Sequence, residues 1–249
     1  SKEPLVISNC FIYDCGNYGI FVETQKATRP ETFYAKVVNC HAEGNSKGFG
    51  NKGSGGTQFI GCTAVENLRH GFHLTQASYG DQIIACVANK NGKNGVSVDT
   101  TYKGALDISN VKANGNGGNG IAINVSVTTI WMKDVIISNI QTRGNGHNGV
   151  TIYGRLESLI LSNVSAVENG QNSINSQTNR GIIVSGQNKQ VTITGNNVYD
   201  KQETQTQVVG IQVSNSTEEL VVTGNNVISY SDSNAYQIPA HATFEGNSV

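Results

Sequence analysis

One short phrase recurs along the whole chain: a glycine, an apolar residue, any residue, and a second apolar residue. Clear copies begin at Gly19, Gly71, Gly95, Gly120, Gly149, Gly181 and Gly210, and a degenerate copy begins at Gly48. Successive glycines of this set lie 23 to 32 residues apart. Self-similarity at such a period indicates a repeat architecture, in which each repeat is one small unit that stacks on its neighbours.

A second phrase precedes each glycine. It begins with an apolar residue and ends three positions later on Cys, Val or Ile, as at 7–10, 37–40 and 108–111. Both phrases alternate apolar and other residues, which is the period of a β-strand. Strands this short can bury an apolar face only by stacking on equivalent strands in the neighbouring repeats. We therefore predict an all-β chain: a single-stranded right-handed parallel β-helix of about nine coils. Residues 1–249 are expected to form one domain, which a longer chain can contain.

The composition excludes several other classes of protein. Charged residues make up 14% of the chain, well below the roughly 25% of an average soluble domain, which argues against a charged helical bundle. No apolar run approaches the roughly 20 residues that span a bilayer, so no membrane partner is expected. The net charge of −1 argues against non-specific nucleic-acid binding, which needs a basic excess.

Aligning the repeats predicts columns of like residues along the rod. One column holds Ala42, Ala64, Ala88, Ala113 and Ala166, with Ile12 and Thr142 as variants. Three residues later, a second column holds Asn45, Asn67, Asn91, Asn116, Asn145 and Asn169. An Asn at this position can adopt a left-handed turn conformation and bond its amide to the next coil. A third column holds Cys10, Cys40, Cys62 and Cys86, and we expect free, inward-facing thiols because stacked strands rarely suit disulfide geometry.

Polar residues on the outer surface are the candidates for function, because side chains fill the core of a β-helix. The strand after each glycine is expected to project its middle residue outward, and proton carriers and cations gather there over the first four coils. The predicted catalytic residues are Tyr18, His70 and His73. The predicted substrate-binding residues are Glu23, Lys47, Lys52, Arg69, Asp99, Tyr153 and Arg155.

These residue types suit an extended acidic polysaccharide that lies in a groove along the rod. A cation, including a protonated histidine, would neutralise the carboxylate of a uronate, so that the neighbouring proton becomes acidic and a base removes it. Reprotonation from the other face gives epimerisation, whereas loss of the glycosidic oxygen gives lyase cleavage. A hydrolase with two carboxylates is less well supported, because Glu23 and Asp99 are expected about three coils apart. The remaining alternative is that these side chains are solvated surface residues of a passive solenoid.

The segment Glu66-Asn67-Leu68-Arg69-His70-Gly71-Phe72-His73 resembles the Asn-x-Arg-His-Gly-Phe-Asn stretch of mannuronan C5-epimerase catalytic modules. One coil earlier, the segment Tyr18-Gly19-Ile20-Phe21-Val22-Glu23 resembles the Tyr-Gly-Phe-Asp-Pro-His of that family. The resemblance implies catalytic roles for Tyr18, Arg69 and His70. The catalytic Asp and the His of the family correspond here to Phe21 and Glu23, and the lysine that the family takes from a more N-terminal coil has no counterpart.

A second resemblance is to calcium-dependent pectate lyases. It is carried by Asn45-Ser-Lys-Gly-Phe-Gly-Asn-Lys52 and by Phe59-Ile-Gly-Cys-Thr-Ala64. The acidic calcium ligands of that family are replaced here by Lys47, Arg69, His70 and His73. Because a hard cation needs carboxylate oxygens, we expect no metal and no cofactor at this position.

A second function class is also open: a non-catalytic, polysaccharide-binding module such as a segment of a phage tailspike. An open β-helix end exposes sheet edges and invites assembly, so either a monomer or a homotrimer is expected. The expected location is extracellular or on a virion. Long insertions at 25–31, 172–179 and 201–207 would either line the groove or contact neighbouring molecules.

Overall fold

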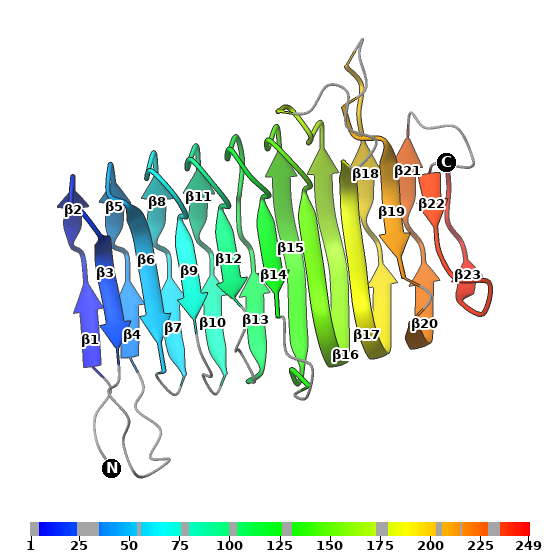
Figure 1. Cartoon of the computed structure of the whole chain (residues 1–249), viewed down its shortest axis with the longest axis horizontal. Helices are drawn as coiled ribbons and strands as arrows, with labels where there is room; N and C mark the ends of the chain where they lie inside the picture. Colours follow the sequence, from blue (N-terminus) through cyan, green and yellow to red (C-terminus); the bar gives the residue numbers. More distant parts are fainter. Residues whose placement is uncertain are drawn as a thin grey trace.

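The computed structural model describes residues 5–23, 35–53, 56–75, 80–99, 104–125, 131–172, 179–202, 206–214, 216–228 and 235–249. Strands follow one another along a rod in chain order, from β1 at one end to β23 at the other (Figure 1). Each coil of the chain contributes strands to three faces of the rod. The predicted insertion at 25–31 lies outside the described residues, as do the central parts of the other two, 173–178 and 203–205.

The first face carries one strand from each successive coil. Its strands are β1 (Leu5–Ser8), β4 (Ala35–Val38), β7 (Thr57–Ile60), β10 (Asp81–Ile84), β13 (Leu106–Ser109), β15 (Val135–Arg143), β16 (Val150–Val167), β17 (Arg180–Thr194), β20 (Thr217–Thr223) and β23 (Thr243–Glu245). The strands β15, β16 and β17 are longer because each continues around a corner of the rod onto another face.

The second face consists of the shortest strands. They are β2 (Phe11–Tyr13), β5 (His41–Glu43), β8 (Thr63–Val65), β11 (Val87–Asn89), β18 (Asn197–Tyr199) and β21 (Asn226–Ile228), with the ends of β15 and β16 between β11 and β18. The third face carries the glycine-led phrase. Its strands are β3 (Tyr18–Glu23), β6 (Lys47–Lys52), β9 (Phe72–Thr75), β12 (Val96–Asp99), β14 (Ile121–Asn124), the beginnings of β16 and β17, β19 (Val209–Val213) and β22 (Tyr236–Gln237).

Every strand pairs in parallel with its equivalent one coil away. On the third face, for example, Phe72 of β9 is opposite Val96 of β12, which is opposite Ile121 of β14. This pairing confirms the parallel β-helix predicted from the repeats. It also corrects one distance along the rod. Because β3 pairs with β6 and β6 with β9, the Tyr18 segment precedes the His70 segment by two coils, not by one.

The apolar residues of the three faces meet in one continuous core. Phe49, Phe59 and Phe72 are fully buried, and the rings of Phe49 and Phe72 stack with centroids 5.1 Å apart. Burial of each such side chain contributes roughly 1.5–3 kcal/mol. The alanine column is fully buried as well. Its small side chains let the backbone of the third face approach closely, since a methyl group on Gly48 would meet the Cβ of Ala64.

The asparagine column is a buried ladder that bonds adjacent coils. In Asn91, Nδ2 donates to Oδ1 of Asn116 at 3.0 Å, while Oδ1 accepts from Nδ2 of Asn67 at 2.9 Å. The expected left-handed conformation lies one residue earlier, as at Glu66 and Lys90, where φ is 53°. This residue lies at the corner between the second and third faces, and the Asn that follows it points inward to backbone groups of the neighbouring coil.

The five cysteines are free thiols, among them the four of the predicted column. Cys40, Cys62 and Cys86 are buried in the core and Cys10 is half-buried. Each buried thiol donates to a backbone carbonyl, as from Cys62 Sγ to the Val37 oxygen at 3.3 Å. These residues act as small apolar side chains whose weak donors are satisfied.

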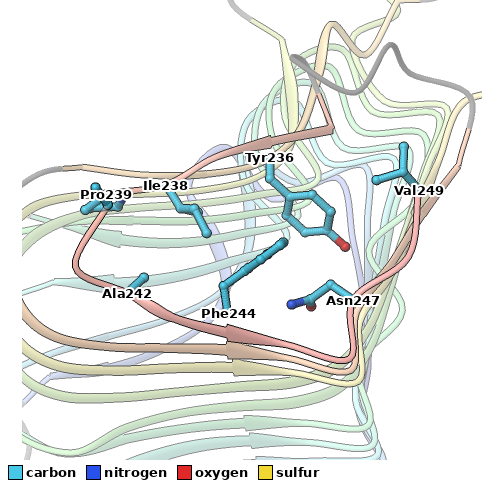
Figure 2. A pocket seen from close by; sticks show the side chains of 8 residues that line it. Tyr236, Ile238, Pro239, Ala242, Phe244, Asn247 and Val249 are labelled. Carbon is cyan, nitrogen blue, oxygen red and sulfur yellow. The ribbon is translucent and has the colours of Figure 1, made fainter.

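At the C-terminal end of the described chain, apolar side chains surround a hollow of about 420 Å³. Figure 2 shows Tyr236 and Phe244 side by side among the residues that line it, with ring centroids 4.9 Å apart in an edge-to-face arrangement. Among the described residues, no helix is long and apolar enough to cross a membrane.

Asn91→Ala is expected to destabilise the protein by about 2–4 kcal/mol, because it leaves two Asn67 donors and the Ala64 carbonyl buried without their partner. Chemical denaturation measures the change. Asn17→Ala, at an exposed position, is the matched control and should change the free energy of unfolding by less than about 0.5 kcal/mol. Equal effects of the two substitutions would show that the ladder does not stabilise the coil stack.

Candidate active site

The middle residues of the third-face strands form one column along the rod. In register order they are Phe21, Gly50, His73, Ser97, Ala122, Thr151 and Ile183. They lie on the outer side of the strands, as predicted, yet His73, Ser97 and Ala122 are buried by neighbouring side chains. The column therefore forms the floor of a site rather than a row of exposed groups.

Gly50 makes room for the most important side chain of the site. A Cβ at this position would overlap the ring carbon Cε1 of Tyr18. Since glycine lacks that atom, the Tyr18 ring lies across the coil of Gly50 and reaches the coil beyond it. On its other side, the Tyr18 ring stacks on Phe21 with centroids 4.4 Å apart.

Three side chains from three coils form a continuous hydrogen-bonded relay. Tyr18 Oη lies 2.6 Å from His73 Nδ1, and His73 Nε2 lies 2.6 Å from Asp99 Oδ2. The carboxylate can only accept, so Nε2 carries a proton and Nδ1 accepts from the phenol. The relay thus fixes the tautomer of His73 and points a proton acceptor at Tyr18.

Further hydrogen bonds fix the far end of the relay. Ser97 Oγ donates to Asp99 Oδ1 at 3.1 Å, and Asn94 Nδ2 lies 3.4 Å from Ser97 Oγ. Burial raises the pKa of Asp99, but the hydrogen bond and positive charge of His73 together with the Ser97 bond outweigh it, so the net pKa is lowered. Asp99 is therefore ionised at neutral pH and can stabilise an imidazolium at His73.

Besides His73 and Phe21, Lys47 also contacts the phenol of Tyr18. Its Nζ donates to Tyr18 Oη at 3.0 Å and lies 4.5 Å from the centre of the Tyr18 ring. Burial raises the pKa of Tyr18 to about 12; the negative charge of Asp99 adds to this effect and the positive charge of Arg69 opposes it. Tyr18 is thus protonated at neutral pH, and it can take up a second proton only as its own passes to His73.

His70 stacks on His73, with ring centroids 5.0 Å apart, and is about nine-tenths buried. Its Nδ1 has no hydrogen-bond partner among the described residues. Burial, together with the nearby His73, lowers the pKa of His70 to about 4. His70 is therefore neutral at neutral pH, which corrects the expectation that a protonated histidine here would hold carboxylates.

Beyond the relay, the next residues of the column lie beneath a depression of about 580 Å³. Its floor is formed by the small side chains of Ser97, Ala122 and Thr151. The residues along one edge precede the strands: His70, Lys93, Asn94 and Asn119. Along the other edge lie Asp99 and Asn124, which end β12 and β14, and their register partner Tyr153 within β16.

The structure brings five of the predicted residues into direct contact with one another. Tyr18, Lys47, His70, His73 and Asp99 form the site described above. Arg69 is exposed beside them, in a turn whose backbone bonds to Ser46 on one side and Lys93 on the other.

Tyr153 lies at the far end of the depression. Glu23 and Lys52 instead form an exposed ion pair of 3.0 Å at the ends of β3 and β6. Arg155 does not line the depression; its guanidinium lies 4.6 Å from the ring centre of Trp131. The separation of Glu23 from Asp99, across β3, β6, β9 and β12, agrees with the expected three coils.

The sequence predicted neither Gly50 nor the lining of the depression apart from His70, Asp99 and Tyr153; the unpredicted lining residues include Ser97 and Lys93. Gly50 stands where the other copies of the phrase carry a side chain, and that gap was the available signal. Ser97 and Lys93 gave no such signal, since the first is a small residue among many and the second an ordinary surface lysine. Among the described residues, no group of three or more His, Cys, Asp or Glu is arranged to hold a metal ion.

The sequence profile of the right-handed beta helix region matches residues 1–133. No curated protein matches the chain. Among solved structures, the mannuronan C-5 epimerase AlgE6 A-module of Azotobacter vinelandii is 15% identical, with a TM-score of 0.50 over 99% of this chain and 58% of that one. Pectate lyase Pel9A is 13% identical, with a TM-score of 0.50 over 98% of this chain and 69% of that one. At this identity the likenesses show the fold alone, and the chain spans little more than half the length of the epimerase module.

The low pKa of His70 predicts a pH-dependent stability. Between pH 6.5 and about 4 the unfolded chain binds a proton at His70 that the folded chain does not, so stability falls as the pH falls through this window. The loss from this residue is at most about 3 kcal/mol. His70→Gln should lose less stability than the unmodified protein over this window in denaturant titrations. His147→Gln, at an exposed position, should behave like the unmodified protein, and parallel curves for all three would contradict the prediction.

Proposed function

Since this chain belongs to the right-handed β-helix family, we propose that it is a carbohydrate-active protein that removes a proton from a uronate in an acidic polysaccharide. The observation that carries the proposal is the relay of Tyr18, His73 and Asp99 with Lys47 at the phenol. The two similar structures are named as a mannuronan epimerase and a pectate lyase, which supports a polysaccharide as the substrate. Such a polymer would be met outside the cell or from the surface of a virion.

Tyr18 is the proton carrier in this proposal. Its phenol oxygen takes the proton from the carbon that bears the substrate carboxylate, while its own proton moves to His73 Nδ1. The resulting imidazolium is stabilised by the ionised Asp99, as in other acid–base relays that use a buried carboxylate. A free tyrosinate is not required, which agrees with the raised pKa of Tyr18.

Arg69 and Lys47 supply the positive charge that this chemistry needs. Arg69 is exposed beside the relay and its charge acts on both Tyr18 and Lys47. A guanidinium binds a carboxylate with two parallel hydrogen bonds, which would withdraw negative charge from the uronate and make the neighbouring proton acidic. Lys47 donates to the phenol oxygen and so stabilises negative charge that develops there.

After proton removal, two outcomes share the same first step. In a lyase, the electron pair forms a carbon–carbon double bond, the bond to the glycosidic oxygen breaks, and that oxygen takes a proton. In an epimerase, a proton returns to the same carbon from the opposite face. Absorbance of the unsaturated uronate detects the first outcome, and uptake of solvent deuterium detects the second.

Tyr18→Phe is expected to reduce turnover by roughly 10²–10⁴-fold on any polymer that the protein converts, because the proton carrier is lost. The assay incubates the protein with alginate, pectate and bacterial capsule polymers and follows both readouts. Tyr13→Phe removes an exposed phenol and is the matched control. Turnover that survives Tyr18→Phe would contradict the role of Tyr18. Binding without turnover across the panel would instead support the non-catalytic, polysaccharide-binding alternative.

Gly50→Ala is expected to reduce turnover without removing any proton carrier, because the added methyl group displaces the Tyr18 ring from His73. Roughly 10–100-fold is expected for misplacement of a catalytic group by about 1 Å. Gly16→Ala is the control, since a Cβ there meets no atom within 4 Å. Circular dichroism should show that both variants fold, and unchanged turnover in Gly50→Ala would show that Tyr18 does not need this position.

A further inference from the structure

We propose that the depression beside the relay binds a neutral sugar, so that the substrate is a heteropolysaccharide in which a neutral residue adjoins the uronate, rather than a polymer of uronates alone. This inference rests on the proposed function, because it takes the uronate to lie at Tyr18. It adds the chemical class of the neighbouring sugar and the direction in which the polymer lies.

The charges of the depression carry the argument. Of the described residues that line it, Lys93 is the one with a permanent positive charge and Asp99 the one carboxylate, and Asp99 is bonded to His73 and Ser97. The remaining lining side chains are amides, hydroxyls, Ala122 and the neutral His70. A uronate in the depression would lose hydration at its carboxylate. The positive charge of Lys93 that could compensate for this loss is already opposed by the carboxylate of Asp99 among the same lining residues.

The same groups suit the hydroxyl and acetamido groups of a neutral sugar. Asn124 is exposed at one edge, and no hydrogen bond holds its amide among the described residues. Tyr153 is 51% exposed beside it and presents a ring face on which the apolar side of a sugar can pack.

The shape of the depression places this sugar on the C-terminal side of the uronate. Tyr18 and Phe21 fill the column on the N-terminal side, whereas Ser97, Ala122 and Thr151 leave it open over β12, β14 and β16. Further along, Ile183 follows Thr151 in the column and closes the floor. The volume of about 580 Å³ is within the range of roughly 300–1,000 Å³ that holds a small organic ligand.

The test compares two groups of oligosaccharides of equal length. The first group contains hyaluronan, heparosan and gellan fragments, in which uronates are separated by neutral sugars. The second contains polymannuronate, polyguluronate and polygalacturonate fragments, in which every sugar is charged. Binding is measured by titration calorimetry with Tyr18→Phe, which prevents conversion, and turnover is measured with the unmodified protein. We expect at least roughly 10-fold tighter binding, about 1.4 kcal/mol, for a member of the first group.

Tyr153→Ala tests whether the depression itself provides this preference. It should weaken binding of the first group by roughly 5- to 20-fold and leave binding of the second group nearly unchanged. Ile160→Ala is the matched control, because Ile160 is 41% exposed on the same strand β16 but on another face of the rod. It should change neither.

The outcomes separate this inference from the proposed function. Equal or tighter binding of the fully charged group, or binding of neither group, overturns the inference. Turnover confined to the fully charged group overturns the inference while supporting the proposed function. Preferential binding of the first group that Tyr153→Ala abolishes, with no turnover of any polymer, supports the inference while contradicting the proposed proton abstraction.

Discussion

The in-register stacking of parallel coils is the constraint on which the rest of this protein depends. Each backbone strand pairs with its equivalent one coil away, so a residue type that suits one coil must suit the same position in the next. The buried asparagine ladder makes the register specific, since each amide bonds both its predecessor and its successor. A shift of one residue would leave these amides and the backbone groups they satisfy buried and unpaired.

The site is built where single residues depart from the pattern that the stacked coils repeat. A column of the third face that would otherwise carry ordinary side chains holds Gly50 next to His73. The missing Cβ lets Tyr18 cross an entire coil and reach His73, which in turn reaches Asp99 in the coil beyond. The scaffold is rigid and regular, so one omitted methyl group is enough to bring residues from non-adjacent coils into contact. Preorganised geometry of this kind is what proton transfer requires.

The relay and the depression divide the site into a charged part and a neutral part. Lys47, Arg69 and Asp99 gather around Tyr18, whereas amides and hydroxyls line the coils that follow. Burial raises the pKa of Tyr18 and lowers that of His70, which reinforces the protonated phenol and the neutral imidazole at neutral pH. The chemistry expected at the first part and the recognition expected at the second follow from this difference in charge.

The sequence alone determined the coil, its parallel stacking and the columns of alanine, asparagine and cysteine. These features recur from coil to coil, and a periodic pattern can be recognised from the sequence without a structure. It also led to the prediction of Tyr18, His70 and His73, because titratable side chains are rare in the glycine-led phrases, and the structure places these three close together. It could not show which of the predicted polar residues are partners. Glu23 and Lys52 neutralise each other, and Arg155 lies against Trp131, although both sets looked equally suited to a substrate.

Only the tertiary structure decided the distances between coils and the burial of each group. The 2.6 Å contacts of His73 depend on the space above Gly50 and on the rotamers of side chains from separate coils, and a one-dimensional pattern contains neither. The neutral state of His70 likewise follows from its burial and from the nearby His73. Local repetition therefore specifies the scaffold, whereas the chemistry of the site arises from contacts between positions where the repeat is broken.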